Sequence, residues 1–115
     1  MERIIENMYI WQESRYVVNA IYRMLKDNRD WGFKDQIQRA AVSIMNNIAE
    51  GFESGSDAKF KSFLNNALGS CSEVRSMLYL CEDLEYCPKE TRIDLQSRLR
   101  KISTGIAKMI ETLTR

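Results

Sequence analysis

The amino-acid sequence predicts an all-α protein, an antiparallel up-down-up-down four-helix bundle that occupies residues 1–115 as a single domain. Apolar residues recur at spacings of three and four along four segments, which is the period of a helix with one buried face. No segment alternates polar and apolar residues in the manner of a strand. The single proline and five glycines argue against long loops, and amphipathic helices joined by short loops pack naturally as a bundle.

The first two helices are expected at about residues 8–25 and 28–53. Asp27, followed by Asp30, can accept hydrogen bonds from the free N–H groups at the start of the second helix, so the connection near LKD should be very short. The segment ESGS, which includes Gly55, is a typical helix stop. The buried side of the first helix is predicted to contain Trp11, Val17, Val18, Ile21, Met24 and Leu25.

The last two helices are expected at about residues 57–85 and 88–114. Ser56 or Asp57 can cap the third helix. Pro88 disfavours helical geometry at Cys87 but suits the first turn of a helix, so it should separate the third helix from the fourth. The fourth helix has a heptad seam with alternating spacings of four and three, formed by Leu95, Leu99, Ile102, Ile106, Met109 and Leu113.

Polar residues of the second helix, in the stretch QRAAVSIMNNIAEGFESG, are sorted unusually cleanly. On a helical wheel one side is apolar (Phe33, Ile37, Ala41, Ile44 and Ile48), and a third side carries Val42, Met45 and Ala49. The polar strip lies nearly opposite the first side and contains Arg39, Ser43, Asn46, Asn47 and Glu50. A helix that is apolar over more than half its circumference is expected to be contacted from several directions.

A second polar strip is predicted on the third helix, where Asn66, Ser70 and Glu73 are spaced four and three apart. Small residues accompany it, namely Ala67, Gly69, Ser70, Ser72 and Ser76, and they suit a close approach by another helix. The two strips can face each other and exchange hydrogen bonds, with Arg39 pairing to Glu50 or Glu73. The alternative is that both strips face water.

Catalytic and metal-binding chemistry has few candidates in a chain without histidine. A Ser-His or Cys-His nucleophile is excluded within one chain, and the usual zinc and di-iron bundle sites lose their imidazole ligands. The densest carboxylate cluster, Glu82 with Asp83 and Glu85, is expected to be a solvated face. We therefore expect no enzyme activity, no cofactor and no metal.

Cysteine usage and hydropathy point to a soluble, cytoplasmic protein. Cys71, Cys81 and Cys87 are odd in number and lack zinc-site spacing, so they are expected to be packed, reduced thiols. Neither a signal peptide nor a spanning helix is recognisable. Net charge is +1 overall, and residues 89–115 form the only clearly basic segment, with seven positive and three negative charges.

Four stretches of the sequence, IWQES, QIQRAAVSIMNNIAEGF, KFKSFLNNALGSCSEVRSML and CEDLEY, resemble the 23S rRNA intervening-sequence (S23-type) family over residues 10–86. Its superfamily includes accessory proteins of diversity-generating retroelements. The resemblance implies a closed four-helix bundle and assembly into five-membered rings. Retroelement members are strongly basic and bind nucleic acid together with a reverse transcriptase. The family-motif residues carry over to Arg39, Ser43, Asn47, Glu50, Gly51, Gly69, Ser70 and Glu73.

This sequence departs from many relatives, which have paired arginines before AAVSI, a proline after it and further arginines after NIAEG. The corresponding places here hold Gln38, Met45, Glu53 and Ser54. Because the net charge is near neutral, binding to nucleic acid is expected to be weak at physiological salt unless charge is concentrated on one face.

Two functions are expected from these observations. The first is a non-enzymatic, homo-oligomeric assembly or adaptor protein, expected as a pentamer, whose partners are further copies of itself and another protein. The alternative is a nucleic-acid-binding accessory factor without sequence preference that uses a basic flank of the fourth helix. That flank carries Arg98, Lys101, Lys108 and Arg115, with Asp94 as its only acid. The flank can equally be a solvated face whose long side chains cover the seam.

Overall fold

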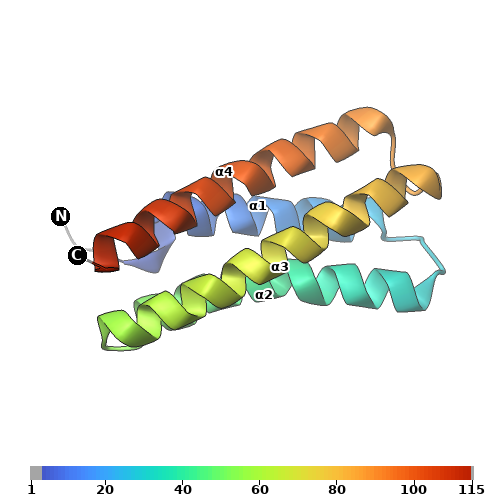
Figure 1. Ribbon diagram of the computed structural model, residues 1–115. Coiled ribbons are helices and arrows are strands. Elements are labelled where there is room, and N and C mark those ends of the chain that lie inside the picture. Colours follow the sequence, from blue (N-terminus) through green and yellow to red (C-terminus); the bar gives the residue numbers. More distant parts are fainter. Residues whose placement is uncertain (1–3, 115) are drawn as a thin grey trace.

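The computed structural model describes residues 4–114 and confirms the all-α class, with four α-helices and no strand in that range. A short 3₁₀ helix, η1 (Ile5–Asn7), precedes α1 (Tyr9–Met24), α2 (Trp31–Phe52), α3 (Asp57–Asp83) and α4 (Lys89–Thr114). Consecutive helices run in opposite directions, and the connections alternate between the two ends of the bundle (Figure 1). The described chain measures 44 × 25 × 21 Å.

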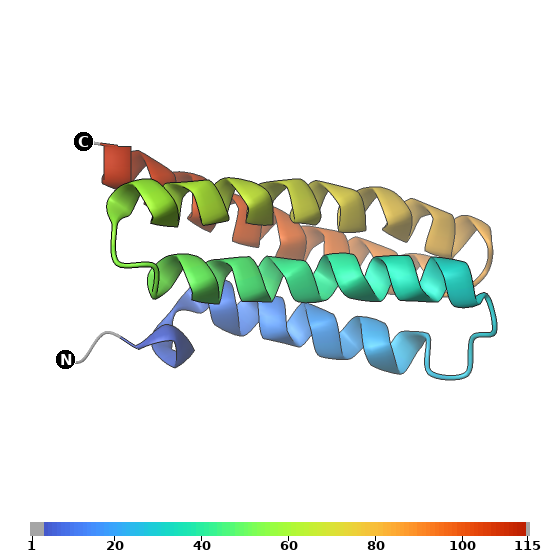
Figure 2. The same cartoon turned by 90° about the horizontal axis from the view of Figure 1, so that it is seen from below.

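The helices form a closed ring in which α1 packs on α2, α2 on α3, α3 on α4, and α4 on α1. Figure 2 shows the same four rods from below, with α2 and α3 side by side and joined at one end. The contact between α2 and α3 and the contact between α1 and α4 therefore lie on opposite edges of the bundle. Helix α2 is apolar over a wide arc because both α1 and α3 pack on it.

The connection between α1 and α2 differs from the predicted one. It spans six residues, from Leu25 to Asp30, and α2 begins at Trp31 instead of residue 28. Asp30, not Asp27, is the N-cap, and its carboxylate accepts a hydrogen bond from the backbone N–H of Phe33 at 3.4 Å. Asn28 in turn accepts from the N–H of Asp30 at 2.8 Å, which fixes a turn that the sequence prediction did not include.

The ends of α3 follow the sequence more closely. Ser56 caps its start by accepting from the N–H of Lys59 at 3.2 Å. Gly55, with φ of 86°, adopts the left-handed conformation that stops the preceding segment. At the other end, α3 finishes at Asp83, two residues before the predicted end, because Glu85 turns to a φ of 62°. Helix α4 then starts directly after Pro88.

The core consists of one cluster of apolar side chains to which all four helices contribute. The heptad seam of α4 is buried from Leu95 to Ile106, and its last two members, Met109 and Leu113, are half-buried. All three cysteines are buried free thiols, as predicted. Two polar residues are also buried among the described residues, Ser14 and Gln96, and both form hydrogen bonds.

Two glycines set how closely the helices approach on opposite edges of the bundle. A β-carbon added at Gly51 would lie 2.8 Å from Cδ1 of Phe60 and 2.9 Å from Cβ of Phe63, so α3 packs directly on the backbone of α2 there. A β-carbon added at Gly105 would lie 2.6 Å from Cγ2 of Ile10, which brings α1 equally close to α4. Real β-carbons do not make contacts this short, so both positions require glycine unless the neighbours move.

Candidate functional sites

The two predicted polar strips meet between α2 and α3 through a short chain of neutral hydrogen bonds. The Ser43 hydroxyl accepts from Ser70 Oγ on α3 at 2.9 Å and from Asn47 Nδ2 at 2.9 Å. Asn47 Nδ2 also lies 2.8 Å from the Ser43 carbonyl oxygen, to which it donates. All three side chains are half-buried. The structure therefore brings three of the eight family-motif residues together inside one subunit.

The charged residues of the strips do not pair as expected. Arg39 forms an exposed ion pair with Asp35, one turn earlier on its own helix, at 2.8 Å. Glu73 accepts from Gln36 at 3.2 Å. Glu50 is exposed and forms no hydrogen bond or ion pair with any residue in the described range 4–114. The predicted pairing of Arg39 with Glu50 or Glu73 is not formed within the subunit, because Arg39 is paired with a carboxylate four residues earlier on its own helix.

The two family-motif glycines behave differently. Gly51 is buried and is in the close approach to α3 described above, whereas Gly69 is exposed and a β-carbon added there would meet nothing within 4 Å. Of the small residues of α3, Ala67 is buried and Ser72 and Ser76 are exposed. The prediction that Gly69 admits a neighbouring helix is therefore not met within one subunit.

A shallow hollow lies on the outer side of α2. Tyr22 of α1 forms one edge, and most of the polar strip forms the rest. The α2 residues that line it are Arg39, Val42, Ser43, Asn46, Asn47 and Glu50. Apart from the Arg39–Asp35 pair, its charged group is the exposed Glu50, so the hollow offers amide, hydroxyl and carboxylate groups to a contacting surface.

Arg98, the first residue of the predicted basic flank, is neutralised within the subunit. Its guanidinium donates to Glu13 of α1 at 2.8 Å and to Asp94 at 3.2 Å, and it covers the ring of Tyr16 at 3.8 Å. The hydrogen bond that Arg98 donates to the Glu13 carboxylate raises the pKa of Arg98 further above its usual value. Asp94 is therefore not the only acid on this flank, because α1 contributes Glu13. Arg115 lies outside the described residues.

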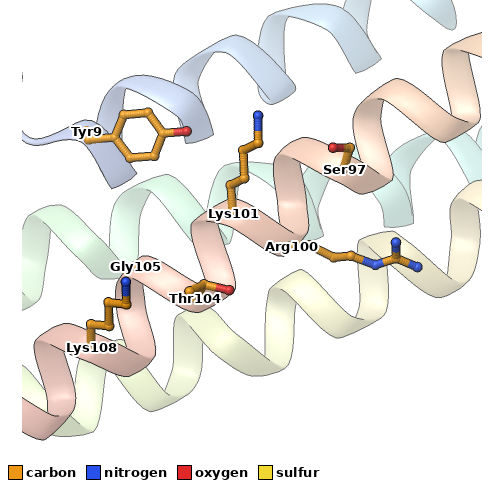
Figure 3. A pocket seen from close by; sticks show the side chains of 7 residues that line it. All are labelled: Tyr9, Ser97, Arg100, Lys101, Thr104, Gly105 and Lys108. Carbon is orange, nitrogen blue, oxygen red and sulfur yellow. The ribbon is translucent and has the colours of Figure 1, made fainter.

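Lys101 and Lys108 line a second hollow, on the side of α4 that faces the start of α1 (Figure 3). Five other residues complete its lining: Tyr9, Ser97, Arg100, Thr104 and Gly105. No carboxylate is among these lining residues. Arg100 and Tyr9 were not predicted. Arg100 could have been predicted, because positions 97, 100, 101, 104 and 108 share one face of a helix. Tyr9 could not, because it lines the hollow only through the packing of α1 on α4.

The thiols are chemically quiet. Burial raises the pKa of Cys71 to about 11 and that of Cys81 to about 12, so neither forms an appreciable thiolate at neutral pH. Within residues 4–114 no group of three His, Cys, Asp or Glu side chains is placed to hold a metal ion. The same part of the chain contains no helix long and apolar enough to cross a membrane.

The fold and its two surfaces define a small four-helix bundle protein with a polar strip on one edge and a basic hollow on the opposite edge. The chain belongs to the 23S rRNA-intervening sequence protein family, whose sequence model matches residues 6–108. This match extends the resemblance noted above into α4. No curated protein matches the chain.

A solved structure is similar over most of the chain. It is the 1.70 Å crystal structure of a protein of unknown function from the S23 ribosomal protein family of Bacteroides thetaiotaomicron VPI-5482. The identity is 26%, the TM-score is 0.81, and the match covers 88% of this chain and 97% of that one. The similarity supports the same bundle for both proteins.

Proposed function

We propose that this protein is a non-enzymatic, homo-oligomeric assembly or adaptor protein that forms a closed ring of subunits. The observation that carries the proposal is the outer face of α3. Exposed residues at positions 62, 65, 69, 72, 76 and 80 follow helical spacing and form one face, with the backbone of Gly69 uncovered at its centre. Glycine costs about 1 kcal/mol relative to alanine in a helix interior. Close approach by a second chain would offset that cost.

Exposed apolar groups continue this face toward the end of α3. Leu80 and Leu84 are each about half exposed, at 47% and 48%. A face that is different from the surface it contacts produces a heterologous interface, and such interfaces close into rings when the rotation between subunits allows it. The buried, reduced thiols fit a cytoplasmic location, which is part of the proposal.

The oligomeric state is the first test. Light scattering coupled to size exclusion should give a mass several times 13.5 kDa, with five subunits expected. A bulky side chain at Gly69 should break the assembly, so Gly69→Leu is expected to elute as a smaller species. Gly32→Leu is the matched control, since Gly32 is also exposed on a helix with nothing within 4 Å. A parent that is monomeric at micromolar concentration overturns the proposal.

The exposed carboxylates of the strips provide a second readout. Glu50 and Glu73 are both exposed in the subunit. Glu50→Ala and Glu73→Ala should therefore change the free energy of unfolding of an isolated subunit by less than about 1 kcal/mol. In an assembly that covers the strips, the same variants should shift the oligomer toward smaller species. Variants that assemble like the parent indicate that both strips face water.

A nucleic-acid-binding accessory role is the second candidate, and the basic hollow on α4 favours it. Arg100, Lys101 and Lys108 lie together there without a lining carboxylate. Binding through phosphates should fall steeply with salt. Titration of oligonucleotides at about 50 and about 200 mM salt should show weak binding that Lys101→Glu with Lys108→Glu abolishes. Lys26→Glu with Lys59→Glu, which changes net charge equally at two exposed positions elsewhere, is the control. Absence of binding at the lower salt removes this candidate.

A further inference from the structure

The cations of α4 divide into two groups according to their partners. Arg92 is bound to Glu82 at 2.7 Å, and Arg98 is bound to Glu13 and Asp94. The side chains of Arg100, Lys101 and Lys108 form no hydrogen bond or ion pair with any residue in the range 4–114, and all three residues are exposed. These three cations line the hollow, whereas Lys89, an exposed cation at the start of α4, does not.

The lining of the hollow includes hydrogen-bond donors suited to phosphate oxygens. Lys101 and Lys108 are seven residues apart, about 10 Å along the helix, and the Ser97 and Thr104 hydroxyls belong to the same lining. Figure 3 shows Lys101 extending toward α1, on the side where the Tyr9 ring lies, whereas Arg100 extends away from Tyr9. Such a row of cations can contact phosphates that follow one another along a strand.

Tyr9 adds an aromatic surface to this hollow. Its side chain is 53% exposed, and its ring stacks on no other ring or guanidinium within residues 4–114. Gly105 lets the start of α1 come close to α4, which places Tyr9 beside the lysines. Tyr16, seven residues later on the same flank of α1, is different because the Arg98 guanidinium covers its ring. Tyr9 is therefore the open aromatic platform of this edge.

We propose that the hollow between α1 and α4 binds single-stranded nucleic acid, with an unpaired base stacked on Tyr9 and neighbouring phosphates on Lys101 and Lys108. The inference rests on the second candidate function and specifies its ligand. An exposed aromatic ring beside cations is the arrangement that sequence-independent single-strand binders use, because every base has a face that can stack. A duplex keeps its bases stacked on one another and can offer only its phosphates to this surface.

The test compares oligonucleotides and variants by fluorescence anisotropy at about 50 mM salt, with single-stranded RNA and DNA of about 12 nucleotides and the corresponding DNA duplex. Tyr9→Ala should weaken single-strand binding about 5- to 150-fold, whereas Tyr9→Phe, which keeps the ring, should bind like the parent. Tyr22→Ala is the matched control, since Tyr22 is 46% exposed on the same helix but lines the other hollow. Duplex binding should be weaker than single-strand binding and unaffected at Tyr9.

The outcomes separate this inference from the function on which it rests. If single strands and duplex bind equally and Tyr9→Ala binds like the parent, the stacking role is wrong, and sensitivity to the Lys101→Glu, Lys108→Glu pair keeps the second candidate. If no oligonucleotide binds at the lower salt, both fail. Binding only to vesicles of anionic lipid would also overturn the inference. Because Tyr9 is exposed, Tyr9→Ala should melt like the parent, which circular dichroism checks.

Discussion

The α2–α3 contact and the α1–α4 contact lie on opposite edges of the bundle. In each contact a glycine lies beneath a large side chain of the neighbouring helix, but the polar side chains nearby differ. On the α2–α3 edge, the neutral side chains of Ser43, Asn47 and Ser70 form hydrogen bonds with one another, and Glu50 beside Gly51 is exposed. On the α1–α4 edge, Arg98 is paired with Glu13, whereas the side chains of Lys101 and Lys108, which line the hollow with Gly105, have no partner within the described residues. The second edge therefore leaves positive charge available for a ligand.

The position of the family-motif residues supports this contrast. All eight lie on α2 or α3, and none lies on α4. The groups proposed to bind nucleic acid lie instead on α1 and α4, where the sequence is more basic. The difference suggests that the fold and a ligand surface can be altered independently in this bundle.

The largest expected effect comes from adding a methyl group at the two close-contact glycines, Gly51 and Gly105. Gly51→Ala and Gly105→Ala should unfold more easily than Gly69→Ala by about 1–3 kcal/mol, because the new methyl group overpacks the contact. Gly69→Ala should gain up to about 1 kcal/mol in an isolated subunit, since alanine is the better helix former. Urea unfolding of the three variants measures these differences. Equal stabilities would mean that α1 and α3 shift at little cost.

The next effect concerns the charged edge. Glu13→Gln removes the better-shielded partner of Arg98 and should cost about 1–2 kcal/mol. The Glu13 side chain is 19% exposed, whereas that of Asp94 is 54% exposed, so Asp94→Asn should cost less than about 0.5 kcal/mol. Thermal melts at low and high salt check both values. A larger loss for Asp94→Asn would reverse the assignment of the main partner.

A smaller effect is expected on the α2–α3 edge. Ser70→Ala removes one donor to the Ser43 hydroxyl, which keeps its hydrogen bond from Asn47, so the cost should be about 0.5–1.5 kcal/mol. Ser72→Ala, at an exposed position on the same helix, is the control and should change the stability by less than about 0.5 kcal/mol. The denaturant midpoints of the two variants and the parent are compared, provided that the dependence of the unfolding free energy on denaturant concentration is the same for all three. Equal midpoints would show that the chain of hydrogen bonds contributes nothing measurable.

The smallest effect at neutral pH concerns the α3–α4 contact, where Cys71 has a pKa raised from 9.0 to about 11, chiefly by burial. An unfolded thiol loses its proton first, so the unfolded state binds fewer protons between these values and stability falls as pH rises. The loss should approach about 1.4 kcal/mol per pH unit from this thiol and vanish below pH about 9. Urea unfolding of the parent and Cys71→Ala across this range tests it, and identical slopes would contradict it.

Much of the fold was predictable because helix periodicity is local. The four helices, the seam of α4, the Ser56 cap and the buried cysteines follow from residue spacing and turn chemistry. The connection between α1 and α2 was less predictable, since Asp27 and Asp30 are both good caps and the Asn28 hydrogen bond decides between them. Gln96 was also missed, because its burial depends on the Arg75 carbonyl and Arg92 from other turns.

For the candidate sites, the sequence by itself determined which side chains share a helix face, and only the tertiary structure decided which of them are paired. Spacing alone placed Arg98, Lys101 and Lys108 on one flank of α4, yet Glu13 arrives from α1 and removes Arg98 from the available charge. Tyr9 enters the hollow from α1 for the same reason, and Gly51 and Gly69 differ only in what stands opposite them. Helix periodicity is set by the backbone over a few residues, whereas partners across helices are set by how the bundle closes.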